Sequence, residues 1–76
     1  MSIPINEHDA VALLHDLPAQ KLQAGETGVV VYVHDHGKAF EVEFPNPGGD
    51  PRFRVLTIEA KDLLRLQPGA RLKPTG

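Results

Sequence analysis

Residues 29–44 read VVVYVHDHGKAFEVEF, and this stretch decides the fold. The segment 40–44 alternates apolar and acidic side chains without a break. Successive side chains of a strand point to opposite faces, so the alternation predicts a strand with Glu41 and Glu43 in water. Its core-facing side chains are expected to be Phe40, Val42 and Phe44.

The segment 29–33 is β-branched nearly throughout, which disfavours a helix and predicts a second strand, buried on most of both faces. Between the two strands, residues 35–38 are typical of a tight turn, in which Gly37 would take a positive φ. Together these features predict a β-hairpin.

Seven glycines and seven prolines divide the chain into short apolar runs. Runs of this length, separated by turn signals, are typical of a small antiparallel β structure. The remaining strands are expected within 9–17, 53–58 and 63–66, with a single helical turn at 59–62 before the last one. The segment 45–51 is a loop rich in proline and glycine.

The run 9–17 fits two structures. Its apolar residues recur at the i, i+3, i+4, i+7 spacing of an amphipathic helix, with Asn6 placed as a cap. Val11 and Leu13 also alternate with Ala12, as in a short half-buried strand. A helix of this length is marginal unless it is packed, and a barrel built from the other runs needs a strand to close its edge. We therefore expect a strand, with the helix as the alternative.

Composition limits the classes of function. The 76 residues, 41% hydrophobic and 24% charged, suffice for one small domain. Without cysteine, a disulfide, a thiolate zinc site and a cysteine nucleophile are excluded. The formal net charge of -2 argues against a dedicated binder of nucleic acid or anionic membranes. No apolar run approaches the roughly 20 residues of a membrane-spanning helix, and no signal peptide is apparent, so we expect a cytoplasmic protein without a membrane partner.

The expected order is strand, long loop, strand, tight turn, strand, loop, strand, helical turn and short strand, which is the layout of an SH3-like barrel. The segment 22–33 looks like the glycine-flanked loop and valine-rich strand of KOW-type domains. A longer pattern, from about Asp9 to Leu66, resembles the bacterial family called domain of unknown function 4926. It is carried by the segments 9–18, 22–28, 39–44, 56–58 and 62–66.

This resemblance implies a bacterial source and an all-β fold, a small SH3-like barrel of about five antiparallel strands with one short helical turn before the last strand. It supplies no activity and no catalytic residues. We expect an N-terminal segment at 1–8, the barrel at 9–67 and a C-terminal tail at 68–76.

Nothing in the residues favours an enzyme. Glu41 and Glu43 are paired carboxylates, but their spacing is the strand period, and no nucleophile elbow accompanies them. A barrel of this size is filled by its own side chains, which leaves little room for a substrate. We therefore expect no catalytic residue and no cofactor.

The turn after the valine-rich strand raises the question of a metal site. On an extended segment, His34 and His36 would point the same way and reach one ion. A closed site needs further ligands, and His15 or Asp16 would supply one only if the first strand ran close to this turn. We expect a solvated turn, with a metal site at His34 and His36 as an alternative.

Two strands carry apolar side chains on both faces. In the fourth strand, Leu56 and Ile58 are expected to face the core, with Phe53, Val55 and Thr57 on the opposite face. In the valine-rich strand, one face is expected to carry Val30 and Tyr32 and the other Val29, Val31 and Val33. A barrel cannot bury both sets, so one apolar face should be partly exposed unless the segment 3–5 covers it.

This surplus of apolar surface predicts a non-enzymatic protein-interaction module that binds another protein or a second copy of itself. An accessory, regulatory or antitoxin/immunity-type small bacterial protein is the kind of module expected. The expected partner-binding residues are Tyr32, Arg52, Phe53, Arg54 and Val55. The alternative is an RNA-binding KOW-like module, with the two arginines on phosphates and the two aromatic residues as stacking platforms.

Overall fold

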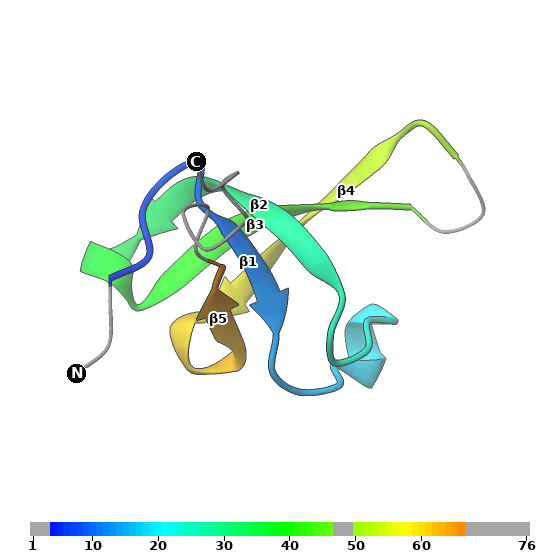
Figure 1. Ribbon diagram of the computed structural model, residues 1–76, viewed down its shortest axis with the longest axis horizontal. Coiled ribbons are helices and arrows are strands. Elements are labelled where there is room, and N and C mark those ends of the chain that lie inside the picture. The colour runs from blue at the N-terminus through cyan, green and yellow to red at the C-terminus, as the bar shows by residue number, and fades with distance from the viewer. Residues whose placement is uncertain (1–3, 47–49, 67–76) are drawn as a thin grey trace, which may run out of the picture.

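The structure, a computed structural model, describes residues 4–46 and 50–66. Within them the chain forms five strands and three one-turn 3-10 helices (Figure 1). The strands are β1 (Ala10–Leu13), β2 (Thr27–His34), β3 (Ala39–Pro45), β4 (Phe53–Glu59) and β5 (Leu63–Arg65). The 3-10 helices are η1 (Pro18–Gln20), η2 (Asp35–Gly37) and η4 (Ala60–Asp62). None of these described helices has the length or apolar character needed to cross a membrane.

The strands form one antiparallel sheet in the order β4-β3-β2-β1-β5. β1 pairs with β2 on one side and with β5 on the other, so the short last strand returns to lie beside the first (Figure 1). η4 connects β4 directly to β5. The prediction of an all-β fold of about five antiparallel strands, with a helical turn before the last one, is therefore confirmed, and the SH3-like description is compatible with this sheet.

The core lies on one face of the strands, where β3 contributes the alternating set that the sequence predicts. Phe40, Val42 and Phe44 are almost fully buried, while the two glutamates between them are only partly buried. The remaining buried hydrophobic residues of the described chain are Val11, Leu13, Leu22, Val30, Ile58 and Leu63. Of the predicted cover at 3–5, Ile5 packs against this cluster and Pro4 is exposed, whereas Ile3 lies outside the described residues.

β1 is a strand, as expected, rather than a helix. Val11 and Leu13 are buried on the same face, in register with β2 and β5. Leu14, which the helical alternative would have buried beside Leu13, is 46% exposed. A backbone hydrogen bond also holds the end of β1, since Leu14 donates its N–H to the carbonyl of Asp62.

A β-bulge overturns the face assignment predicted for β2. The register shifts between Val30, which pairs with Val42, and Tyr32, which pairs with Glu41. Val31 is the extra residue, and it breaks the period of two. Val30 is therefore buried while Tyr32 points outward, and the prediction that they share a face is wrong. The same shift places Val29 and Val33 on opposite faces: Val29 pairs with the outward Glu43, and Val33 with the buried Phe40.

The hairpin between β2 and β3 turns through three consecutive left-handed residues. Gly37 has φ 96°, which confirms the positive φ predicted for it, but Asp35 and His36 also have positive φ values of 49° and 55°. The extended path assumed from His34 to His36 is therefore wrong. The two imidazoles do not follow strand alternation, because the chain has already turned between them.

Candidate functional site

The outer face of strands β2 to β4 is the side opposite the core. Strand register places its side chains in rows across the three strands. One row runs Val29, Glu43, Val55, and a second runs Tyr32, Glu41, Thr57. At the end of the hairpin, Pro45 pairs with Phe53. We call these eight residues the outer face.

Four large hydrophobic side chains are exposed together on the outer face. Tyr32 and Phe53 are each 57% exposed, Val55 is 51% exposed and Val29 is 41% exposed. Single exposed hydrophobic residues are normal, but a group on one face of a sheet marks an interaction site. Beside Phe53, a groove of about 290 Å³ continues the apolar surface toward Ala10 and Leu66.

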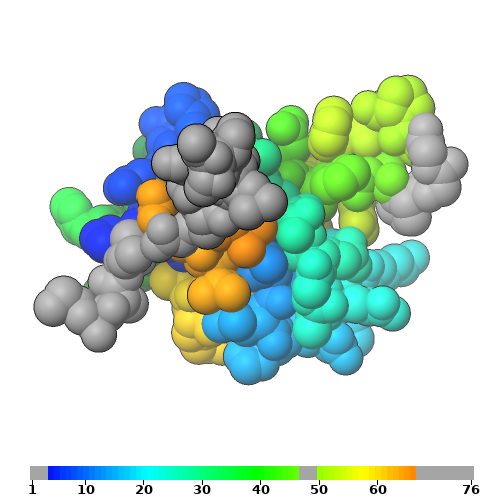
Figure 2. Space-filling model, viewed as in Figure 1, coloured from blue at the N-terminus to red at the C-terminus, as the bar shows by residue number. Residues whose placement is uncertain are grey.

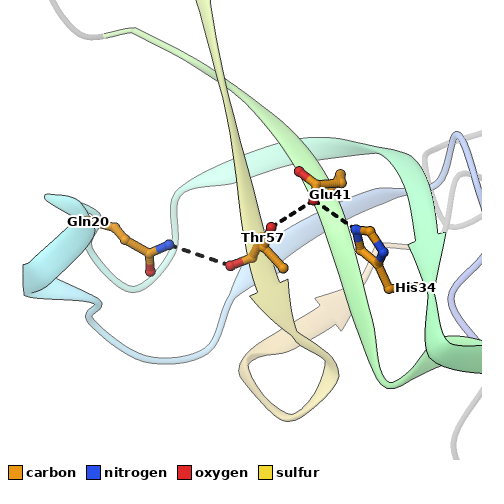
Figure 3. A network of polar contacts seen from close by, with 4 residues as sticks. All are labelled: Gln20, His34, Glu41 and Thr57. Atoms are coloured by element: carbon orange, nitrogen blue, oxygen red, sulfur yellow. Dashed lines mark hydrogen bonds and ion pairs between the residues drawn. The ribbon is translucent and has the colours of Figure 1, made fainter.

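A polar network crosses the middle of this face (Figure 3). The Thr57 hydroxyl donates to Oε2 of Glu41 at 2.7 Å, and Nε2 of His34 donates to the same oxygen at 2.8 Å. These hydrogen bonds, from Thr57 first and from His34 second, hold the pKa of Glu41 below its ordinary value. The His34 ring also meets the edge of Tyr32, with ring centroids 4.8 Å apart.

The order of groups in the network is not that of a nucleophilic triad. Such a triad places histidine between the hydroxyl and the carboxylate, so that the imidazole takes the hydroxyl proton. Here the Glu41 carboxylate lies between Thr57 and His34 (Figure 3). A lowered pKa also makes Glu41 a weaker base. The network thus orients side chains on the outer face and gives Thr57 no histidine base.

The structure brings three of the five predicted partner-binding residues onto one face. Tyr32, Phe53 and Val55 point outward together. Arg52 precedes β4 and forms a two-point ion pair with Asp50, with distances of 3.1 and 2.8 Å. Arg54 lies on the other face of β4, where only 26% of its side chain is exposed. The expected convergence of two arginines beside Phe53 is therefore absent from the outer face.

Two residues of the outer face escaped the sequence prediction. Val29 was assigned to the face opposite Tyr32, because the bulge at Val31 leaves no trace in a run of three identical valines. Pro45 was placed in the loop, although it pairs with Phe53 as the last residue of β3. Its position in the alternation that starts at Phe40 could have revealed it.

The two histidines considered as metal ligands, His34 and His36, lie in different surroundings. His34 is engaged by Glu41 on the outer face, whereas His36 is an exposed residue of the η2 turn. Across residues 4–46 and 50–66, no group of three or more His, Cys, Asp or Glu side chains could hold a metal ion.

Comparison with protein families agrees with this architecture. Residues 7–65 match the family described as Domain of unknown function (DUF4926). The chain belongs to this family. The match spans all five strands of this DUF4926 domain, and it confirms the resemblance found in the sequence. No curated protein and no solved structure matches the chain.

Proposed function

We propose that this DUF4926 domain is a non-enzymatic interaction module that binds another protein through its outer face, in the cytoplasm of a bacterial cell. The observation that carries the proposal is the exposure of Tyr32, Phe53, Val55 and Val29 on one side of the sheet. Aromatic residues supply much of the binding energy at protein interfaces, and two of these four are aromatic.

The charges of the outer face favour a different protein over a second copy of this chain. Glu43 lies between Val29 and Val55, in the middle of the apolar residues. A two-fold contact between copies would bring the same acidic surfaces together, and like charges in an interface are costly. The matching partner surface is apolar with a lysine or arginine opposite Glu43.

The same carboxylates weigh against RNA as the ligand of this face. Glu41 and Glu43 occupy the centre of the surface on which Tyr32 and Phe53 would stack bases, and they would repel phosphates. Of the two arginines expected on phosphates, Arg54 points to the other side of β4, and Arg52 is paired with Asp50.

The experiment is affinity capture from a lysate of the source cells with matched variants as bait. The outer-face variant is Phe53→Ser with Val55→Ser. The control variant is Leu14→Ser with Leu64→Ser, which removes an exposed leucine just after β1 and another in β5, 46% and 51% exposed.

The proposal expects one protein to be retained by the wild type and the control variant and lost with the outer-face variant. Retention by all three baits, or by none, would contradict it. Sedimentation of the purified chain adds a second readout, because a dimer that the outer-face variant abolishes would make the partner a second copy and overturn the choice of a different protein.

A further inference from the structure

A cleft of about 430 Å³ lies between the β1–β2 loop and the inner side of β4. Side chains of the loop between Asp16 and Glu26 form one wall of the cleft, and the side chain of Arg54, on β4, lines the opposite wall. Figure 2 shows the loop, in cyan, below the outer end of the β3–β4 hairpin, in green and yellow. We propose that this cleft binds a carboxylate group through Arg54 and Lys21. The site is separate from the outer face, because Arg54 and Phe53 lie on opposite sides of β4.

The loop wall is held by its own backbone. Pro18 begins η1, and Lys21 ends it in a left-handed conformation with its N–H on the carbonyl of Pro18. Leu17 and Leu22 then pair as an isolated bridge, which brings the buried Leu22 into the floor of the cleft. This arrangement fixes the backbone of Lys21, which lines the cleft.

Arg54 has poor partners for a largely buried cation. Its Nη1 donates to the carbonyl of Gln20 at 3.5 Å, the outer limit of a hydrogen bond. Its Nη2 is 3.9 Å from Oε1 of Glu26, too far for one. Its Nε is buried with no acceptor among the residues that the structure describes. Burying a charge is costly unless the charge is paired and hydrogen-bonded. Arg54 therefore lacks the close carboxylate that would offset this cost.

One oxygen of each acidic residue in the cleft accepts a hydrogen bond from the backbone of the loop. Oε2 of Glu26 accepts the backbone N–H of Gln23, and Oδ1 of Asp16 accepts that of Ala24, both at 2.8 Å. Arg52, two residues before Arg54, shows the contrast, since Asp50 binds its guanidinium at two points. A carboxylate entering the cleft would give Arg54 the same kind of partner.

The lining also limits the rest of the ligand. Pro18 and Leu22 provide apolar walls next to the two cations, and the volume is at the small end of ligand pockets. A carboxylate on a short aliphatic group fits this combination. Two sources share that chemistry, the C-terminal residue of a peptide and a free aliphatic acid.

The test uses 1H–15N spectra of the full chain, in which the Nε–H of each arginine gives its own signal. The probes are N-acetyl-Ala-Leu, its C-terminal amide, and isovalerate. Saturable shifts of Arg54 Nε–H and of the Leu22 and Gln23 amides with either acid support the site, and the tighter acid identifies the source. The proposal is overturned if neither acid gives saturable shifts at millimolar concentration, or if the amide binds as well as the peptide acid.

Variants distinguish binding of the acid in the cleft from non-specific attraction of anions to the protein surface. Arg54→Gln should weaken binding of the acid at least about tenfold, because it removes a charged hydrogen-bond donor pair. Arg52→Gln, the matched control, should leave the affinity unchanged. Lys21→Gln, at an exposed position where the fold is not at risk, should weaken binding severalfold. Equal binding by the wild type and by Lys21→Gln or a folded Arg54→Gln would contradict the proposal.

Discussion

Val30 and Tyr32 lie on opposite faces of β2, although two residues apart in a regular strand share a face. The bulge at Val31 absorbs one residue and turns the aromatic ring away from the core. Tyr32 then lies in one row with Glu41 and Thr57 on the outer face. The bulge is therefore what adds an aromatic residue to the proposed binding surface.

Gly28 is required by the close approach of β2 and β3. A Cβ at this position would lie 2.6 Å from the backbone oxygen of Glu43 and 2.8 Å from a methyl carbon of Val42. Gly28→Ala should therefore force the strands apart and lower the free energy of unfolding by about 1 to 3 kcal/mol. Urea denaturation would measure the loss. Thr27→Ala, at the exposed neighbouring position, should stay within about 0.5 kcal/mol of the wild type.

Asp9 joins the N-terminal segment to β5. One of its oxygens accepts the backbone N–H of Asn6 at 2.8 Å and Nε of Arg65 at 2.9 Å, and both side chains of the ion pair are largely buried. Asp9→Asn should lower the free energy of unfolding by about 1 to 2 kcal/mol, because it leaves Arg65 without a counter-charge.

The exposed ion pair of Asp50 and Arg52 is the control for Asp9→Asn. It has similar distances, but the Arg52 side chain is 82% exposed. Asp50→Asn should therefore change the urea midpoint little, because solvent screens exposed pairs. Equal effects of the two substitutions would show that burial does not determine the strength of these ion pairs.

Acid should weaken the fold through Glu41. Hydrogen bonds from Thr57 and His34 hold its pKa below the ordinary value of 4.5 in the folded chain. As the pH falls below 4.5, the unfolded chain therefore takes up a proton before the folded chain does, and stability is lost. Glu41→Gln should remove this component, so that its urea midpoint falls less steeply with acid than that of the wild type.

Glu43→Gln provides the comparison for the acid effect. It removes a carboxylate from the same face of β3 without touching the network of Thr57 and His34. Its urea midpoint should follow the acid dependence of the wild type. The explanation fails if Glu41→Gln and Glu43→Gln flatten the acid dependence to the same degree.

The sequence predicted those parts of the fold that depend on local alternation. The inward Phe40 and Ile58 and the outward Phe53 follow directly from the period of two. The bulge at Val31 could not be predicted, because three identical valines fit either register.

Contacts between segments that are distant in the chain could not be predicted from the sequence either. His34 and Glu41 meet because the turn at η2 sets the hairpin register, and Arg54 meets Gln20 across 34 residues because the β1–β2 loop folds onto β4. The segment 18–26 has no apolar period, so nothing in it indicated that it would form a wall of a cleft.

Charge reversal tests the chemistry of the proposed partner. Glu43 is the outer-face carboxylate without a hydrogen bond among the described side chains, so it is the one available to a partner cation. Glu43→Lys should weaken capture of the partner, and added salt should weaken the wild-type complex more than the variant complex. A complex that gains affinity from Glu43→Lys would show that the partner surface is acidic.

The most direct measurement of the central claim is the dissociation constant for the captured partner by calorimetry, for Phe53→Ala and for Leu64→Ala. Both residues are exposed, 57% and 51%, but only Phe53 lies on the outer face. We predict that Phe53→Ala weakens binding about tenfold or more and that Leu64→Ala leaves it within about twofold. Equal affinities of the two variants would contradict binding through the outer face.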